Sequence, residues 1–311
     1  MNGEFVIFGG TANPALAAAV ARALGIRLGR STVERFPDGE LTVNVLEVVR
    51  RKEVFILQAT APPVNEHLVE LLAFTDVCRR ASAAHISAIV PYFGYARADK
   101  RHGRREPITA SMVAEMLQAV GVNHVITIDL HAPQIEGFFH IPVDSLTAVP
   151  VMCDAIRPQL PPGTVVVSPD AGRVRMATQY AERLKTSLVV LHKMRESGTK
   201  THVTHLVGHV QDRPCLIIDD MISTGGTIAE SISTLRGAGS RPEIYVAATH
   251  GLFLAGARSK LTDASVTRMF VTDTVEQTER AWPPLEIVSV ASLIAGAIQR
   301  VIADGSMSDL S

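Results

Sequence analysis

The fold of this chain is decided by Cys215-Leu216-Ile217-Ile218-Asp219-Asp220-Met221-Ile222-Ser223-Thr224-Gly225-Gly226-Thr227-Ile228. The stretch begins as a short apolar run, typical of a buried parallel strand, and two adjacent carboxylates follow it. A helix is expected beyond the Ser-Thr-Gly-Gly-Thr loop, because Ile228, Ile232 and Leu235 fall on one helical face. Gly237 and Gly239 supply stop signals. The stretch therefore predicts a strand, a short loop and the start of a helix.

The chemistry of this loop favours an anion. Glycines let backbone N–H groups turn toward a phosphate, hydroxyls add donors, and a helix N-terminus attracts negative charge. Asp219 and Asp220 would repel that phosphate unless they face the vicinal hydroxyls of a sugar or a metal ion. We interpret the motif as a site for a phosphorylated sugar; the alternative is an ordinary turn with two solvated acids. The residues of the expected phosphate cradle are Ser223, Thr224, Gly225, Gly226 and Thr227.

Length and composition favour two α/β domains of ordinary size. The chain has 311 residues, of which 47% are hydrophobic and only 5% aromatic, as expected for sheets rich in Ala, Val, Ile and Leu. A formal net charge of −1 supplies no general field for nucleic acid or an anionic membrane, so neither is expected as a partner. Cys78, Cys153 and Cys215 are far apart in apolar surroundings, which indicates buried thiols in a reducing compartment. There is no signal pattern and no apolar run of ~18 residues, so a cytoplasmic protein is expected.

Apolar runs alternate with amphipathic stretches along most of the chain. This alternation predicts an α/β fold of parallel sheets with helices on both faces. The expected strands are Phe5–Phe8, Val54–Leu57, Ile86–Val90, Val125–Ile128, Val165–Val167, Leu188–Leu191, Leu216–Ile218, Ile244–Ala248 and Met269–Val271. The clearest expected helices are Asn65–Arg80, Thr109–Val120 and Thr227–Arg236.

Prolines cluster between Pro142 and Pro162, which indicates a crossing between two halves. We expect an N-terminal domain over residues 1–146 and a C-terminal domain over residues 147–290. Residues 291–311 are expected to form a helix that packs back on the N-terminal domain and ends in a frayed tail.

Polar residues follow several expected strands, and open α/β sheets bind ligands at the carboxyl ends of their strands. Each of these segments also has an ordinary interpretation: a surface turn, a solvated charged face or a structural hydrogen-bonding pair. They are Phe36-Pro37-Asp38-Gly39-Glu40, the segment Pro91–Arg101 with its basic continuation to Arg105, Asp129-Leu130-His131, Ser168-Pro169-Asp170-Ala171-Gly172 and Lys193-Met194-Arg195. The second segment mixes aromatics, including Tyr92 and Tyr95, with cations. Lys193 and Arg195 are expected on the same side of an extended segment, and residues 193–200 are expected to include a mobile loop. The sequence contains no Walker loop, nucleophile elbow, kinase His-Arg-Asp motif or His-Glu-x-x-His zinc motif.

Taken together and in order, these segments resemble those of the ribose-phosphate pyrophosphokinase family, and the similarity runs from about Phe5 to Val301. The resemblance implies two phosphoribosyltransferase-type domains, each a mostly parallel sheet flanked by helices. It implies transfer of the β,γ-diphosphoryl group of ATP to the 1-hydroxyl of ribose 5-phosphate, giving phosphoribosyl pyrophosphate and AMP. It also implies a homohexamer built from dimers.

The same resemblance assigns roles to individual residues. Asp219 and Asp220 would hold the ribose 2- and 3-hydroxyls, and residues 223–227 would cradle the 5-phosphate. His131 and Asp170 would position Mg²⁺. Lys193 and Arg195 would stabilise the pentacoordinate β-phosphorus, and the expected ATP contacts, partly from a neighbouring subunit, are Phe36, Asp38, Glu40 and Arg97.

This sequence departs from the family pattern at a few positions. Ala98 stands where a glutamine that helps to read adenine is common, so the preferred nucleotide stays open. Arg173 replaces the second glycine of the Ser-Pro-Asp turn; it would be strained if the position needs a positive φ, or it brings a new cation to the site. Ser223 replaces a frequent aspartate. Two alternatives stay open: a regulatory relative that associates with a true synthetase, and a phosphoribosyltransferase that consumes the activated sugar.

Overall fold

The computed structural model describes the chain except for residues 1–4, 102, 104, 198–199, 278–281 and 311. The side chains of residues 193–204 also lie outside the description. Internal contacts divide the chain into two compact units. The first comprises residues 1–147, 274–276 and 289–311, and the second comprises residues 148–273 and 277–288.

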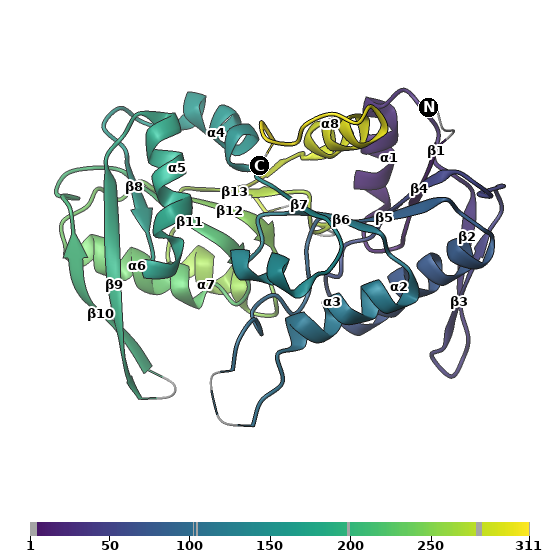
Figure 1. Ribbon diagram of the computed structural model, residues 1–311. Coiled ribbons are helices and arrows are strands. Elements are labelled where there is room, and N and C mark those ends of the chain that lie inside the picture. Colours follow the sequence, from purple (N-terminus) through teal and green to yellow (C-terminus); the bar gives the residue numbers. More distant parts are fainter. Residues whose placement is uncertain (1–4, 102, 104, 198–199, 278–281, 311) are drawn as a thin grey trace. The chain divides into compact units, whose positions relative to one another are not determined.

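The first unit is built on a five-stranded parallel sheet in the order β1-β4-β5-β6-β7. Helices α2 and α3 cover one face of the sheet, and α1 and α8 pack together on the other (Figure 1). A separate antiparallel hairpin, β2–β3, is inserted between β1 and β4. The strands are β1 (Phe5–Gly9), β2 (Ser31–Arg35), β3 (Leu41–Val45), β4 (Glu53–Leu57), β5 (His85–Val90), β6 (His124–Ile128) and β7 (Val143–Leu146). The helices are α1 (Pro14–Ala23), α2 (Val64–Arg80), α3 (Thr109–Val120), the short η1 (Pro133–Phe138) and α8 (Ala291–Ile302).

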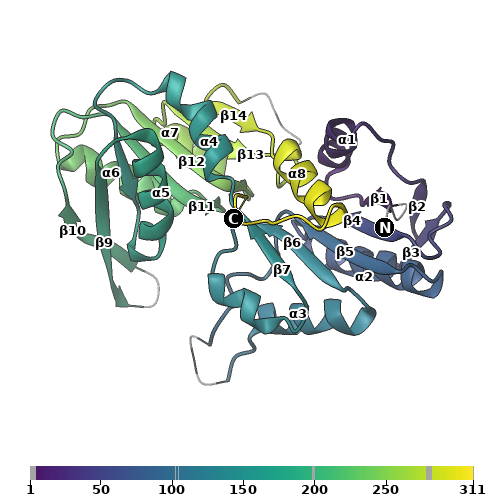
Figure 2. The same ribbon diagram turned by 45° about the horizontal axis from the view of Figure 1, so that its top comes forward.

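The second unit is built on a seven-stranded sheet in the order β10-β9-β8-β11-β12-β13-β14. All neighbouring strands are parallel except the β9–β10 pair. The helices lie on both faces, with α4 beside α5 and α6 beside α7 (Figure 2). The strands are β8 (Val165–Ser168), β9 (Leu188–Ser197), β10 (Lys200–Val207), β11 (Cys215–Ile222), β12 (Ile244–Gly251), β13 (Arg268–Thr272) and β14 (Leu285–Val288). The helices are α4 (Val149–Ile156), η2 (Arg157–Gln159), η3 (Ala171–Arg173), α5 (Val174–Leu184), α6 (Gly226–Gly237) and α7 (Ala257–Asp263).

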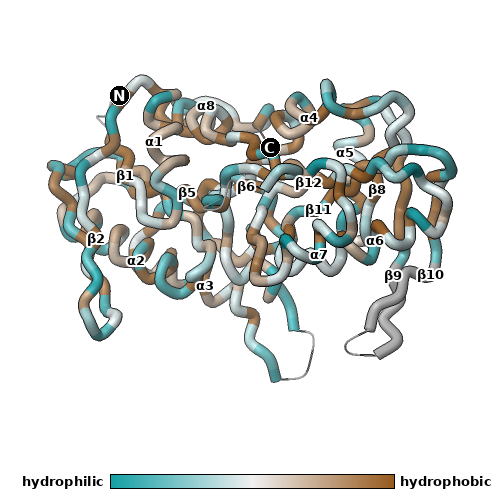
Figure 3. The backbone as a smooth tube through the Cα atoms, turned by 180° about the vertical axis from the view of Figure 1, so that it is seen from behind, coloured by the Kyte–Doolittle hydropathy of each residue, from teal (hydrophilic) through white to brown (hydrophobic). Residues whose placement is uncertain are grey.

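Apolar residues concentrate along the central strands of each unit, as the hydropathy-coloured tube shows (Figure 3). Ile217 of β11 and Val246 of β12 are fully buried, and both belong to the core of the second unit. Ile228, Ile232 and Leu235 of α6 are buried in the same core, as the helical periodicity predicted. Burying an aliphatic side chain of this size contributes roughly 1.5–3 kcal/mol, so these three residues fix α6 firmly onto the sheet.

The structure confirms the predicted fold class, and every apolar run expected to be a strand lies in one. Two strands are longer than expected. β11 continues through Asp219 and Asp220 to Ile222, because β12 supplies parallel partners as far as Gly251. β9 continues beyond the apolar run Leu188–Leu191 to Ser197, because β10 pairs with it. None of the helices in the described ranges combines the length and apolar character that crossing a bilayer requires.

Candidate functional site

The loop between β11 and α6 is short and anchored at both ends. The backbone carbonyl of Ser223 accepts a hydrogen bond of 2.9 Å from the N–H of Leu254. The chain then turns at Gly225, which has φ of 72°, and helix α6 begins at Gly226. A left-handed conformation is readily reached only by glycine, so Gly225 is what lets the chain pass from strand to helix in three residues.

The beginning of α6 offers unpaired donors. Gly225 occupies the N-cap and has no side chain to cap the first turn. The first N–H groups of a helix have no intrahelical partner, and the helix dipole adds positive potential there. Thr224 and Thr227 are exposed beside this turn, and Ser223 is half-buried. Backbone amides and three hydroxyls therefore form an arrangement suited to a phosphate.

Two carboxylates stand at the end of β11, just before this loop. The Asp220 residue is 1% exposed and the Asp219 side chain is 12% exposed. The backbone N–H of Asp220 donates a 2.9 Å hydrogen bond to Oδ1 of Asp219. Burial and the neighbouring Asp220 carboxylate raise the pKa of Asp219 well above its ordinary value. The acid pair is thus costly to ionise and needs a compensating charge or donor.

Arg173 provides a positive charge against this pair. Its Nη1 lies 3.4 Å from Oδ1 of Asp220, and its Nε lies 3.9 Å from Oδ1 of Asp219. Arg173 has φ of −100°, so the position does not need a left-handed backbone and the side chain carries no strain of that kind. Of the two alternatives that the sequence left open, the structure shows the new cation.

Asp170 begins the turn that carries Arg173. Its Oδ1 accepts hydrogen bonds from the N–H groups of Gly172 at 2.8 Å and Arg173 at 3.2 Å. Both are local bonds at the start of η3, and they fix the carboxylate at the end of β8. Asp170 is half-buried, so it remains accessible.

Lys193 and Arg195 lie in strand β9, where their backbones pair with Val203 and Thr201 of β10. The extended backbone agrees with the sequence expectation for these two residues. The expectation of a loop over residues 193–200 was wrong for the described positions, because residues 193–197 lie in β9 and Lys200 begins β10. The side chains of Lys193 and Arg195 lie outside the described part of the structure, and their roles stay predictions.

In the first unit, Phe36 to Glu40 form the tip of the β2–β3 hairpin. The N–H of Phe36 bonds the carbonyl of Glu40 at 2.8 Å, and Oδ1 of Asp38 accepts from the N–H of Glu40 at 3.0 Å. All of these residues are exposed, and 48% of the Phe36 residue is accessible. About half of this aromatic residue is therefore accessible to a partner outside its own unit.

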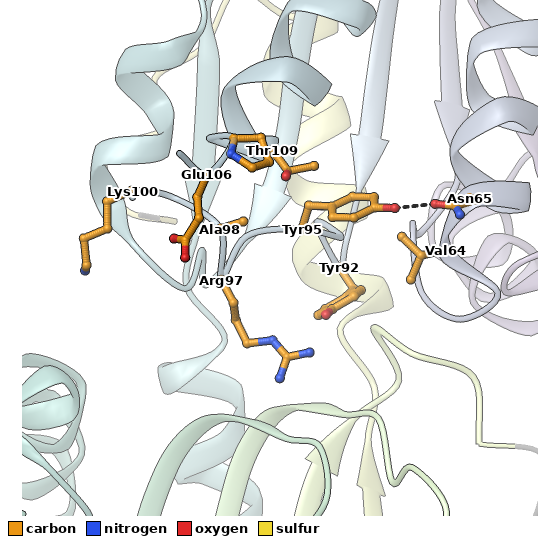
Figure 4. Close-up of a pocket in the computed structure, with 10 residues that line it drawn as sticks. Val64, Asn65, Tyr92, Tyr95, Arg97, Ala98, Lys100, Glu106 and Thr109 are labelled. Atoms are coloured by element: carbon orange, nitrogen blue, oxygen red, sulfur yellow. Dashed lines mark hydrogen bonds between the residues drawn. The ribbon is translucent and has the colours of Figure 1, made fainter. Parts of the chain in front are cut away.

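A cavity of about 560 Å³ lies after strand β5, within the size range of small-molecule sites. The Tyr95 hydroxyl is hydrogen-bonded to Asn65 of α2, and the Arg97 side chain extends away from Tyr95 (Figure 4). Tyr95 has φ of 63°, a strained value for a bulky residue, and such values gather at binding sites. The lining residues are Val64, Asn65, Tyr92, Tyr95, Arg97, Ala98, Lys100, Glu106, Pro107 and Thr109.

The sequence analysis identified Arg97 and Ala98 of this cavity but not its other walls. Tyr92 and Tyr95 were noticed only as aromatics within a basic segment, and Asn65 was placed in a helix without a role. The sequence pattern indicated that the segment could bind phosphate through cations such as Arg97 and Lys100, and both of these residues are exposed. The sequence pattern did not indicate that helix α2 supplies Val64 and Asn65 to the wall of the cavity. Arg104, the fourth cation of the segment, lies outside the described residues.

Asp129 and His131 follow strand β6 in the first unit. Asp129 has φ of 42°, a left-handed value that aspartate adopts more readily than most residues, and its N–H bonds the carbonyl of Leu146 at 2.9 Å. His131 is half-buried two residues further on. Within the described ranges, no three His, Cys, Asp or Glu side chains gather as a metal cluster. Mg²⁺ commonly uses one or two protein groups together with waters and substrate phosphates, so this sparse donor set fits it.

The chain is similar to known proteins over nearly its whole length. Residues 5–121 match the family model of the N-terminal domain of ribose phosphate pyrophosphokinase, and residues 196–311 match that of the phosphoribosyl synthetase-associated domain. The chain is 42% identical to the ribose-phosphate pyrophosphokinase of Chromobacterium violaceum over 310 residues, covering 99% of this chain and 94% of the relative. It is also 42% identical to that of Thermotoga maritima, covering 99% and 98%.

A solved structure shows the same likeness. The crystal structure of phosphoribosylpyrophosphate synthetase from Mycobacterium smegmatis superposes with a TM-score of 0.91 at 37% identity. The match covers 97% of this chain and 100% of that one. The similarity therefore extends over both units and not only over the loop after β11.

Proposed function

The chain belongs to the ribose-phosphate pyrophosphokinase family, and from that premise we propose that it transfers the β,γ-diphosphoryl group of ATP to the 1-hydroxyl of ribose 5-phosphate. The products are phosphoribosyl pyrophosphate and AMP. One observation carries the proposal: Asp219 and Asp220 lie near the end of β11, and α6 begins six residues after Asp220 with no side-chain cap from Gly225. A sugar phosphate has the matching pair of features, a vicinal diol and a phosphate.

Ribose 5-phosphate binds in the second unit. The two carboxylates accept hydrogen bonds from the 2- and 3-hydroxyls, and charged acceptors make such bonds stronger than neutral ones. Ser223, Thr224 and Thr227 donate to the 5-phosphate together with backbone amides of Gly225 and Gly226. These contacts orient the 1-hydroxyl for attack on ATP.

ATP binds with its phosphates near Arg97. The cavity beside Arg97 and Ala98, lined by two tyrosines, supports this placement because it combines aromatic surface with cations. Phe36, Asp38 and Glu40 complete the adenine pocket of a neighbouring subunit in a homohexamer built from dimers. Their exposure at the tip of the β2–β3 hairpin supports a role outside their own unit.

His131 of the first unit and Asp170 of the second unit are the residues that would each supply a ligand to Mg²⁺. When bound, the ion would neutralise charge on the transferred phosphates. Hydrogen bonds from two local amides already orient the Asp170 carboxylate. This favours Asp170 as a ligand, because an oriented side chain loses less conformational entropy when it binds a metal.

Lys193 and Arg195 stabilise the charge that develops on the β-phosphorus as the sugar oxygen attacks in line. Phosphoryl transfer needs positioning and neutralisation more than covalent help from the protein, so a protein nucleophile is not required. The reaction takes place in the cytoplasm, which three free and buried thiols at Cys78, Cys153 and Cys215 support.

The two other functions considered from the sequence are less favoured. A regulatory relative would be expected to lose site residues, yet Asp219, Asp220 and Asp170 are present and the named relatives match over 99% of the chain. A phosphoribosyltransferase that consumes the activated sugar explains the loop after β11. It leaves the first unit, with its 560 Å³ cavity, without a role.

The proposal is tested by AMP formation from ATP, ribose 5-phosphate and Mg²⁺, measured beside Lys193→Ala and Lys260→Ala. Lys260 is an exposed lysine of α7 and serves as the matched control. We expect sugar-dependent AMP release that falls by ~10²–10³ in Lys193→Ala and is unchanged in Lys260→Ala. Ribose 5-phosphate binding without AMP release by the wild type would instead indicate the regulatory relative.

A further inference from the structure

The proposed reaction assigns no role to Arg173, a residue of the second unit. It reaches from the turn after β8 to the carboxylates at the end of β11. Its side chain is 14% exposed, against 12% for Asp219 and 2% for Asp220. Removing a guanidinium from water costs desolvation free energy, and the two acids beside Arg173 offset that cost.

We infer that Arg173 is a positioning residue of the sugar site, which acts as the fixed counter-ion of Asp219 and Asp220 and so sets the affinity for the sugar diol. This inference rests on the proposed function. Two adjacent carboxylates repel one another, and each must stay a hydrogen-bond acceptor to receive a sugar hydroxyl. A guanidinium is always charged, so it compensates both acids without competing for a proton.

The distances place the guanidinium of Arg173 close enough to compensate the charge of both acids. Both N–O separations, 3.4 Å to Asp220 and 3.9 Å to Asp219, are within salt-bridge range. An ionised carboxylate has about four lone-pair sites, so an acid that faces a guanidinium can also accept a hydrogen bond from a sugar hydroxyl. Burial makes the attraction between the guanidinium and the acids stronger than it would be at the surface.

The backbone of Arg173 ties this counter-ion to Asp170. The same residue donates its N–H to Oδ1 of Asp170 at 3.2 Å, and Asp170 is the proposed ligand of Mg²⁺. The turn after β8 thus contributes to two neighbouring functions, holding one carboxylate by its backbone and balancing two others by its side chain.

Direct binding measurements test the inference without any turnover. Calorimetry with ribose 5-phosphate and with 2-deoxyribose 5-phosphate is compared for wild type, Arg173→Met and Arg173→Lys. Methionine keeps an unbranched stem of similar width and removes the charge, whereas lysine keeps a cation. We expect Arg173→Met to weaken ribose 5-phosphate binding at least ~10-fold and the 2-deoxy sugar by a smaller factor, so that the affinity ratio moves toward one. Arg173→Lys is expected to keep most of the wild-type ratio.

Equal weakening for both sugars in Arg173→Met would overturn the inference, because it would place Arg173 on the shared phosphate or in general stability. An unchanged affinity for both would overturn it as well. If Arg173→Met does not fold, Arg173→Gly takes its place with the same expected ratio, since φ of −100° needs no particular side chain. Wild-type AMP release reports on the proposed function separately, so failure of one claim is distinguishable from failure of the other.

Discussion

Gly225 lies so close to Leu261 that a Cβ at position 225 would be 3.0 Å from the leucine Cγ. The glycine also has φ of 72°, so both the backbone and the neighbouring α7 helix exclude a side chain there. The packing of α7 and the backbone of Gly225 therefore both favour glycine in the loop between β11 and α6.

We predict that Gly225→Ala lowers the free energy of unfolding by about 1–2 kcal/mol and weakens ribose 5-phosphate binding. Chemical denaturation and calorimetry provide the two measurements. Gly237→Ala is the control, because φ at Gly237 is not left-handed and no atom lies within 4 Å of the added Cβ. Equal stability of the Gly225→Ala and Gly237→Ala proteins would contradict the strain argument.

Asp220→Asn is predicted to weaken ribose 5-phosphate binding by about 10- to 100-fold, because a hydrogen bond to a charged acceptor is worth roughly 1.5–3 kcal/mol. The measurement is the sugar dissociation constant, with the Michaelis constant for ATP as a second readout that should change little. Asp154→Asn provides a control on an exposed acid of the same unit. If Asp220→Asn binds the sugar as tightly as Asp154→Asn does, Asp220 does not hold a hydroxyl.

Ala98→Gln is predicted to raise the ratio of kcat/KM for ATP over GTP by about an order of magnitude, because a glutamine amide can both donate to and accept from a base edge. Ala98 lines the cavity beside Arg97, so the longer side chain enters that space. Ala84→Gln, at an exposed position of the same unit, is the control. If the ratio of kcat/KM for ATP over GTP is unchanged in Ala98→Gln, the residue at position 98 does not influence nucleotide preference.

Burial raises the pKa of the Cys78 and Cys153 thiols to about 12 and that of Cys215 to about 11. At pH 8 the folded protein therefore holds them as neutral thiols, and we predict that they resist alkylation until the chain is unfolded in urea. An unfolded cysteine ionises near pH ~8.5, so the stability that these groups contribute is complete below that pH and is lost as pH rises toward 11–12. Rapid labelling of all three thiols in the native protein would show that the burial is not maintained.

The sequence was sufficient for the parts of the fold that depend on local pattern. The apolar run before Asp219 and the helical face of Ile228, Ile232 and Leu235 both carry their signal within a few residues. The β7 and β14 strands were not predicted, because they are four-residue strands at sheet edges with little apolar alternation. The extension of β9 to Ser197 depends on β10, and such pairing is a tertiary property that no local pattern contains.

For the candidate site, too, some features could be predicted from the sequence and others could not. The order of the motifs indicated which residues to examine, including Asp170, Asp219 and Asp220. It did not indicate that Arg173 lies against both acids, because that contact joins turns more than forty residues apart. Nor did it indicate that Asn65 of α2 bonds the Tyr95 hydroxyl beside Arg97. Contacts across loops are set by the packing of the sheet, and sequence spacing alone does not specify them.

The most direct test of the central claim follows the phosphorus atoms of ATP by ³¹P nuclear magnetic resonance during incubation with ribose 5-phosphate and Mg²⁺. Transfer of an intact diphosphoryl group predicts AMP and a sugar product with two mutually coupled phosphorus signals in addition to its 5-phosphate. Formation of ADP and a sugar bisphosphate, or no sugar-dependent loss of ATP, would contradict the account.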